Sequence, residues 1–197
     1  MGRSHFSRTD RSRDEGSYRR KGPGVGFYLI VRGPLGSGKT ALARRLTESL
    51  GARYVSIDQI LDEHQLEQWD GDYISEQSFL AANQFAVREA EAGLRRGTLV
   101  IIDGNFYWKP VLDDLVTKLP YPHLVLTLKV PFFDCVARDA GRAYPLGTEN
   151  VRMVFDKVTL FDCGLPLDAT GSLDGTTRRA LRALEDAGLR RTEPTML

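Results

Sequence analysis

The sequence predicts an α/β protein whose five-stranded parallel sheet is covered by helices on both faces. Short runs that are apolar nearly throughout alternate along the chain with longer segments of helical periodicity. Continuous apolar runs are typical of strands covered on both faces, and their alternation with helices is typical of a parallel sheet. The expected strands are residues 27–32, 53–58, 98–103, 123–130 and 165–170.

The expected helices are marked by apolar spacing and by residues that begin or end helices. Leucines recur every four residues from Leu42 to Leu50 and are followed by Gly51, which predicts a helix with one leucine face packed on the sheet. Further helices are expected from Ser75 to about Arg96, after Pro110, after Pro131 and over residues 176–189.

The composition is that of a globular protein with a polar, basic N-terminal segment. Hydrophobic residues make up 42% of the 197 residues, and no apolar run approaches the roughly 18 residues that a membrane span requires. Residues 1–24 contain seven Lys and Arg, three Asp and Glu, and few aliphatic residues, which predicts a flexible Arg/Ser-rich tail. This tail is either a solvated extension or a weak nucleic-acid contact. Residues 25–197 are expected to form one domain.

The two cysteines and the N-terminus bear on the cellular compartment. Cys135 and Cys163 lack the spacing of a metal site or a disulfide framework, and no apolar signal segment opens the chain. We therefore expect a cytoplasmic protein without a membrane partner. The sequence leaves the oligomeric state open.

A phosphate-binding motif follows the first expected strand and opens the first expected helix. Residues 33–40 read GPLGSGKT, which fits G-x-x-x-x-G-K-[ST] in the strand–loop–helix context that the motif requires. Glycines are needed because successive backbone N–H groups must turn inward on the phosphates. Lys39 would reach the β and γ phosphates of ATP, and the Thr40 hydroxyl would bind Mg²⁺. The expected nucleotide-binding residues of this loop are Gly33, Pro34, Leu35, Gly36, Ser37, Gly38, Lys39 and Thr40.

Three classes of protein share this loop, namely GTPase switches, motor ATPases and small-molecule kinases. The sequence contains no NKxD guanine-reading motif, and the residues beyond the tail leave no room for the extra domains of most motors. A kinase is the remaining class. The alternative is a regulatory ATPase module that binds a nucleotide without a dedicated acceptor.

Acidic and polar residues are expected at the carboxyl ends of the second and third strands, where parallel sheets bind their ligands. Asp58 and Asp103 end these strands, and a carboxylate there can accept the proton of an acceptor hydroxyl or hold Mg²⁺ through water. We expect the base at Asp58 and the metal contact at Asp103, whereas the alternative for each is a helix or turn cap. Asn105 and Tyr107 are expected to contact the acceptor, with core packing as the alternative for Tyr107.

A pair of arginines follows the fourth strand. Arg138 and Arg142 are four residues apart, which places both guanidinium groups on one helix face if the helix continues. Such a pair can cover the phosphates and neutralise developing charge when a lid closes. The alternative is a surface ion-pair ladder with Asp134 or Asp139.

Together these motifs resemble the small P-loop kinases, a group that includes adenylate, shikimate, gluconate and adenylylsulfate kinases, zeta-type toxins and the kinase domains of polynucleotide kinases. The resemblance extends over about residues 26–190 and is most specific at residues 33–40. It implies a three-layer P-loop NTPase fold with strand order 2-3-1-4-5, a mobile lid after strand four, and ATP as donor. It also implies a general base at Asp58 and adenine binding at residues 168–171, which include Thr170.

Two segments show how far the resemblance extends on the acceptor side. RDAGRAY at 138–144 is similar to the R-D-x-K-G-x-Y lid of adenylylsulfate kinases, but SIDQIL at 56–61 lacks the arginine expected after strand two. The acceptor therefore stays open. The sequence predicts an ATP- and Mg²⁺-dependent phosphotransferase that acts on a hydroxyl of a small metabolite or of a nucleic-acid end. Its expected catalytic residues are Lys39, Asp58, Arg138 and Arg142.

Overall fold

The structure, a computed structural model, describes residues 26–189. The predicted tail of residues 1–24 lies outside the described residues, as do residues 190–197 of the predicted domain. No helix within residues 26–189 is long and apolar enough to cross a membrane.

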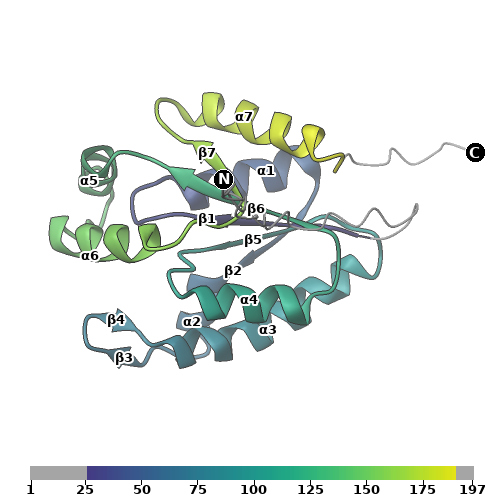
Figure 1. The fold of residues 1–197 in the computed structure, drawn as a ribbon, viewed down its shortest axis with the longest axis horizontal. Coiled ribbons are helices and arrows are strands. Elements are labelled where there is room, and N and C mark those ends of the chain that lie inside the picture. Colours follow the sequence, from purple (N-terminus) through teal and green to yellow (C-terminus); the bar gives the residue numbers. More distant parts are fainter. Residues whose placement is uncertain (1–25, 190–197) are drawn as a thin grey trace, which may run out of the picture.

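A five-stranded parallel sheet forms the centre of the molecule (Figure 1). Its strands are β1 (Tyr28–Arg32), β2 (Arg53–Ser56), β5 (Val100–Gly104), β6 (His123–Lys129) and β7 (Leu165–Asp168). They lie in the order β2-β5-β1-β6-β7. Counted along the chain, this is the predicted order 2-3-1-4-5, because labels β3 and β4 belong to a separate hairpin. The predicted fold class is confirmed.

Helices cover both faces of the sheet and complete a three-layer arrangement (Figure 1). On one face lie α1 (Lys39–Leu50) and α7 (Leu173–Asp186), and on the other lie α2 (Ile57–Glu63), α3 (Glu76–Leu94) and α4 (Lys109–Lys118). Each face has its own hydrophobic cluster, because side chains of a strand alternate between the two faces. In β1, Tyr28 and Ile30 belong to the cluster with α3 and α4, whereas Leu29 and Val31 belong to the cluster with α1 and α7.

Capping side chains set several helix boundaries. The Ser75 side chain accepts a hydrogen bond from the Ser78 N–H at 3.2 Å and begins α3, as predicted. Ser172 likewise accepts from the Gly175 N–H at 3.2 Å, so α7 begins three residues before the expected position 176. Gly51 ends α1 with a left-handed φ of 59°.

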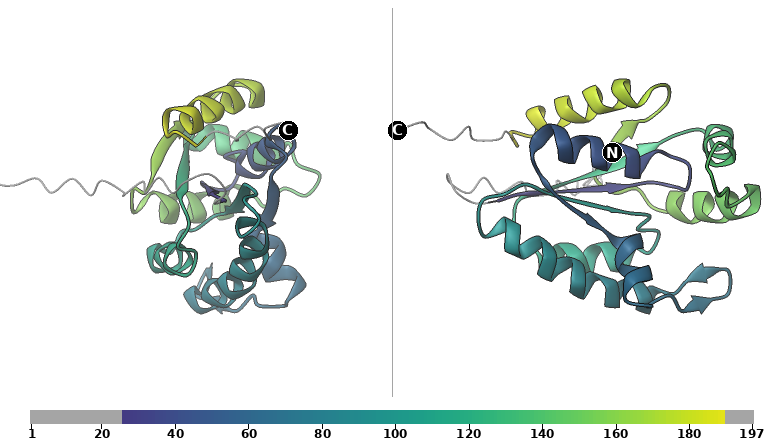
Figure 2. Two further views of the ribbon diagram at one scale, coloured as in Figure 1. Left: turned by 90° about the vertical axis from the view of Figure 1, so that its right-hand side faces the viewer. Right: turned by 180° about the vertical axis from the view of Figure 1, so that it is seen from behind.

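Two further elements, neither of them expected from the sequence, lie at the carboxyl edge of the sheet. They are the hairpin β3 (Trp69–Asp70) with β4 (Tyr73–Ile74), and helix α6 (Thr148–Thr159). Figure 2 shows both at the same end of the molecule as α5 (Phe132–Ala140). The Tyr73 hydroxyl donates to the Met153 carbonyl at 3.5 Å and so joins the hairpin to α6.

Leu46→Ala is expected to lower the free energy of unfolding by about 2–5 kcal/mol, because a fully buried side chain on the sheet-facing side of α1 is replaced by a cavity. Urea unfolding measures the change. The control is Leu160→Ala, whose side chain is 75% exposed and whose loss should change stability little. Equal effects of the two substitutions would contradict the packing of α1 described above.

Candidate active site

The phosphate loop, residues 33–40, joins β1 to α1 and needs glycine at two positions. Gly36 and Gly38 have φ values of 74° and 87°, a left-handed backbone that residues with a Cβ rarely adopt. A Cβ on Gly36 would also collide with the backbone carbonyl of Cys135, so α5 lies directly against the loop. Gly38 offers no side-chain acceptor to the first N–H groups of α1, which leaves them available for an anion.

A buried carboxylate lies beside the lysine and threonine of this loop. Asp103 is 2% exposed near the end of β5, and its Oδ2 accepts a hydrogen bond from the Tyr54 hydroxyl at 3.0 Å. Burial raises the pKa of Asp103, while the Lys39 charge and hydrogen bonds with Thr40 and Tyr54 lower it, and the Asp58 charge raises it further. The structure therefore brings Lys39, Thr40 and Asp103 together, as the sequence predicted.

The other oxygen of Asp103 fits a metal contact. Asp103 Oδ1 is buried and has no hydrogen-bond partner within residues 26–189. An unpartnered buried carboxylate oxygen is costly unless a cation or water satisfies it. Together with the neighbouring Thr40 hydroxyl, it is the kind of oxygen set that Mg²⁺ prefers when phosphates complete the coordination. These residues fit the expected Mg²⁺.

Asp58 lies elsewhere than its predicted place at a strand end. The Ser56 side chain accepts from the Gln59 N–H at 3.2 Å, and this cap ends β2 and begins α2. Asp58 is therefore an exposed residue in the first turn of α2. Ser56 pairs with Asp103 in the sheet, so Asp58, two residues further along the chain, stays at the same carboxyl edge as Asp103.

The two predicted acceptor contacts after β5 have different surroundings. Asn105 is 9% exposed, and its Oδ1 is buried without a partner among the described residues. Tyr107 is 5% exposed, its ring lies 5.1 Å from that of Phe79, and its hydroxyl donates to the Ile74 carbonyl at 3.1 Å. The structure thus commits Tyr107 to packing, whereas Asn105 keeps an acceptor oxygen available.

The predicted arginine pair does not share a helix face, because α5 ends at Ala140, before Arg142. Arg138 donates from Nη1 to the Ser37 carbonyl at 3.0 Å and from Nη2 to the Ala169 carbonyl at 2.9 Å. It therefore joins the phosphate loop to the turn after β7. Arg142 instead pairs with Asp139 at 3.6 Å, which is the alternative that the sequence left open for it.

The turn after β7, which is expected to border adenine, is stabilised by hydrogen bonds within the turn and by hydrogen bonds from α7. The Thr170 hydroxyl and N–H donate to Asp168 Oδ1 at 2.7 and 2.9 Å, and these hydrogen bonds lower the pKa of Asp168. From α7, Arg179 donates to the carbonyls of Asp168 at 2.8 Å and Thr170 at 2.9 Å. Sequence reasoning missed Arg179 and Tyr54, because neither lies in a motif.

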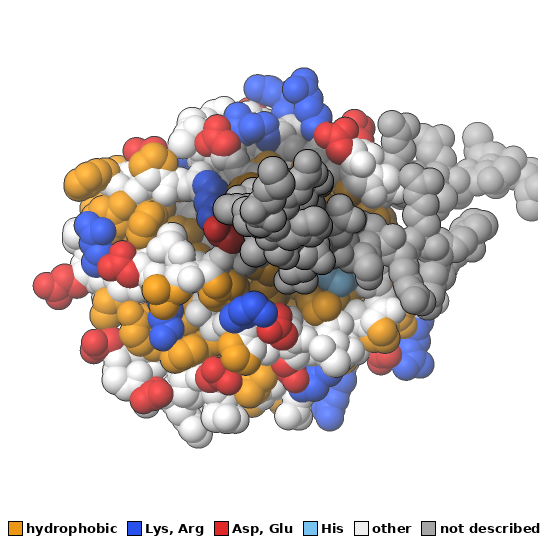
Figure 3. Space-filling view, in the orientation of Figure 1, with side chains coloured by type: hydrophobic (Ala, Val, Ile, Leu, Met, Phe, Trp, Pro, Cys, Tyr) orange, Lys and Arg blue, Asp and Glu red, His pale blue; other side chains and the backbone are white. Residues whose placement is uncertain are grey.

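The carboxyl edge of the sheet also carries exposed apolar side chains and a cavity. Figure 3 shows apolar side chains gathered toward the side of the molecule where α5, α6 and the hairpin lie. A cavity of about 340 Å³ lies between Pro34 of the phosphate loop, Lys129 at the end of β6, Phe155 of α6 and Thr170 after β7. The phosphate loop, α6 and the turn after β7 therefore border one space.

Asp103→Asn is expected to raise thermal stability at neutral pH and to do so less in acid. Because the pKa of Asp103 is raised in the folded state, its charged form costs folding free energy above that pKa, and the cost vanishes below the ordinary value of 3.8. Thermal unfolding between about pH 4 and about pH 8 measures the difference from the natural protein. The exposed Asp70→Asn is the control, and no gain at neutral pH would contradict the assignment.

Comparisons with known proteins agree with this arrangement. The family model AAA_33, described as an AAA domain, matches residues 29–158, which is well over half of the chain. No curated protein matches in a sequence search.

The fold is similar to solved kinases. A sugar kinase from Janibacter sp. HTCC2649 has a TM-score of 0.64 and 19% identity, covering 81% of this chain and 95% of that chain. A gluconokinase from Sinorhizobium meliloti 1021 has a TM-score of 0.61 and 14% identity, covering 82% of this chain and 92% of that chain. At these identities the likeness concerns the fold. The chain belongs to the AAA_33 family of AAA domains and has the fold of the small P-loop kinases.

Proposed function

We propose that this protein is an ATP-dependent phosphotransferase that moves the γ-phosphoryl group of MgATP to a hydroxyl group. The observation that carries the proposal is the grouping of Lys39, Thr40 and Asp103 at a glycine loop, with an exposed Asp58 at the same edge of the sheet. Asp103 Oδ1 has no hydrogen-bond partner within residues 26–189. A nucleotide switch or an ATPase also uses this loop together with a carboxylate that helps to hold Mg²⁺. A second carboxylate that is free to approach an acceptor is what phosphoryl transfer adds.

Each of these groups has a separate part in the proposed reaction. The N–H groups at the start of α1 and the Lys39 ammonium bind the phosphates. Thr40 and Asp103 hold Mg²⁺, which when bound neutralises charge on the phosphates. Asp58 accepts the proton of the acceptor hydroxyl as its oxygen bonds to the γ-phosphorus, and ADP leaves with the electrons of the broken P–O bond. Asn105 Oδ1 can accept a hydrogen bond from the acceptor.

The charges on the acceptor side favour a small, uncharged or cationic hydroxyl compound over a nucleic-acid end. Residues 57–76, which span α2 and the β3–β4 hairpin, contain seven Asp and Glu and no Lys or Arg. A phosphate backbone needs cationic partners and would be repelled here. The two similar structures carry the names sugar kinase and gluconokinase, which supports beginning with polyhydroxy compounds.

Lys39→Ala is expected to lower turnover roughly 100-fold and to weaken MgATP binding, because the cation beside the phosphates is lost. Calorimetry with MgATP and a coupled assay of ADP release measure the two effects. Lys118→Ala is the matched control, since Lys118 pairs with Asp114 at 2.7 Å on the surface of α4. Unchanged MgATP affinity in a folded Lys39→Ala protein would rule out this loop as the nucleotide site.

Asp58→Asn is expected to keep MgATP affinity and to lower transfer to the acceptor by about 100-fold to 10,000-fold, because the amide cannot take the proton. The assay follows ADP production with a panel of polyols, amino alcohols and 5′-hydroxyl oligonucleotides. Asp62→Asn, an exposed residue one turn further along α2, is the control.

Two results of this assay would redirect the assignment. An Asp58→Asn protein that instead needs more Mg²⁺ for hydrolysis without acceptor would identify Asp58 as a metal contact. ATP hydrolysis that no acceptor stimulates would favour the regulatory ATPase module.

A further inference from the structure

A positively charged side chain is buried at the centre of the sheet, directly before the phosphate loop. Arg32 is the last residue of β1, precedes Gly33 and is 0% exposed. It forms no ion pair with any carboxylate of the described chain, and burial lowers its pKa. A buried charge without an ion pair is costly, so an apolar residue at this position would serve stability alone better.

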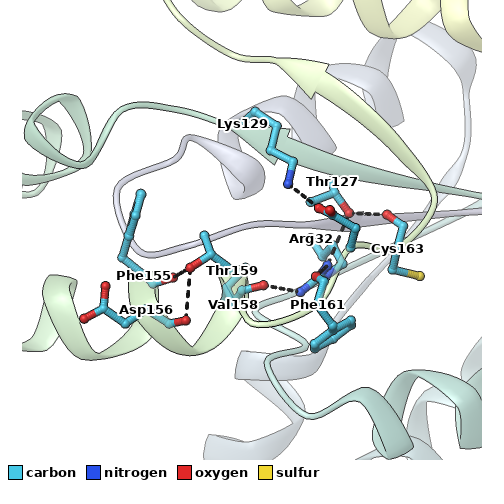
Figure 4. A network of polar contacts seen from close by, with 10 residues as sticks. Arg32, Thr127, Lys129, Phe155, Asp156, Val158, Thr159, Phe161 and Cys163 are labelled. Atoms are coloured by element: carbon cyan, nitrogen blue, oxygen red, sulfur yellow. Dashed lines mark hydrogen bonds and ion pairs between the residues drawn. The ribbon is translucent and has the colours of Figure 1, made fainter.

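The Arg32 guanidinium binds the carboxyl end of α6. Its Nη2 donates to the Val158 carbonyl at 2.9 Å, and its Nη1 donates to the Phe161 carbonyl at 3.5 Å (Figure 4). The Phe161 ring also lies against the guanidinium, with its centroid 4.3 Å from the guanidinium carbon. The last carbonyls of a helix have no partner within the helix and carry partial negative charge, which is why a cation is bound here.

Neighbouring residues contact the turn between α6 and β7, to which Phe161 belongs. Nη1 of Arg32 also donates to the Thr127 hydroxyl at 3.4 Å, and that hydroxyl donates to the Cys163 carbonyl at 2.6 Å. Lys129 pairs with the exposed Asp162 at 2.7 Å. Strand β1 thus holds the end of α6 through Arg32, and strand β6 holds the turn after α6 through Thr127 and Lys129.

The other end of α6 is linked to the phosphate loop through α5. The buried Asp139 carboxylate accepts from the N–H groups of Leu146 and Gly147 at 2.9 and 3.0 Å, just before α6 begins. Asp139 is next to Arg138, which donates to the Ser37 carbonyl. The exposed residues 141–147 therefore lie between two links to the phosphate loop. Arg138 before them contacts the loop at Ser37, and Arg32, which binds the end of α6 after them, directly precedes the loop.

We propose that Arg32 is a positioning residue that couples α6, and the exposed residues 141–147 before it, to the phosphate loop. This inference rests on the proposed phosphotransfer function only for its effect on turnover. Its structural consequence is that α6 keeps one placement relative to the loop, because a buried guanidinium binds the Val158 carbonyl of α6 and the Phe161 carbonyl just beyond the helix. Removal of the guanidinium leaves these carbonyls unpaired and frees α6 to shift over the cavity that Pro34, Phe155 and Thr170 border.

The test compares Arg32→Met, which keeps an unbranched side chain without the donors, with Arg32→Lys, which keeps one donor. Asn83→Ala is the matched control. Asn83 is also 0% exposed, and it joins α3 to α4 by donating to the Val111 carbonyl at 2.8 Å, far along the chain from the phosphate loop. Three quantities are measured, namely the MgATP Kd by calorimetry, amide hydrogen exchange over residues 141–160, and kcat against acceptor KM.

For Arg32→Met we expect exchange over residues 141–160 to rise about tenfold above that of Asn83→Ala, because opening of α6 no longer breaks the Arg32 contacts. We expect kcat to fall about tenfold to a hundredfold, while the MgATP Kd changes less than about threefold. Arg32→Lys should show a smaller rise in hydrogen exchange and a smaller fall in kcat. If Arg32→Met does not fold, Arg32→Lys alone decides the matter, since wild-type exchange and kcat in that variant would overturn the proposal.

The proposal would also be overturned if Arg32→Met lowers the melting temperature only as much as Asn83→Ala does and leaves both kcat and hydrogen exchange over residues 141–160 unchanged. Failure of the proposed function gives a different result. In that case the natural protein phosphorylates no acceptor, while hydrogen exchange and MgATP binding still report whether Arg32 holds α6.

Discussion

The close contact between the phosphate loop and helix α5 determines where the other groups of the site can lie. Gly36 has a left-handed backbone and meets the carbonyl of Cys135, so the loop and the start of α5 touch without an intervening side chain. Any residue with a Cβ at this position would push the two apart. Because α5 lies this close, Arg138 reaches both Ser37 of the loop and Ala169 of the turn after β7. A contact between two backbones thereby joins the phosphate site to the expected adenine side.

The same edge of the sheet contains groups whose burial opposes stability. Within residues 26–189, Asp103 has a raised pKa and one oxygen without a hydrogen-bond partner, and Arg32 is a buried cation without an ion pair. Both cost folding free energy in isolation, since desolvation of charge is unfavourable. The two lie on either side of the phosphate loop in the sequence and in adjacent strands of the sheet. Such a concentration of costly polar groups is typical of a site that is built to act on charged ligands.

The region after β6 is more than a lid that carries a pair of arginines, because it contains helix α6, which contacts several other elements. Gly147, directly before α6, donates to Asp139, and the Val158 carbonyl near the end of α6 accepts from Arg32. Lys157 Nζ lies 3.7 Å from the centroid of the Trp108 ring. These contacts connect α6 to α5, to the sheet and to the segment after β5.

The sequence by itself determined the parallel sheet and the phosphate loop, whereas the strand order was implied by the resemblance to the small P-loop kinases. Apolar strands, helix caps such as Ser75 and the glycine spacing of residues 33–40 are local signals, and local backbone chemistry is sufficient to interpret them. The grouping of Lys39, Thr40 and Asp103 also followed, because the carboxyl ends of parallel strands meet at one edge.

Only the tertiary structure decided which polar side chains remain available at that edge. Because Ser56 caps α2, Asp58 lies in that helix and not at a strand end. Because α5 ends at Ala140, Arg142 does not share a helix face with Arg138. Arg32 meets Val158, 126 residues later in the chain, and no local pattern reports such a contact. The partners of a buried charge depend on how distant segments pack, so the contacts of these residues could be known only from the folded chain.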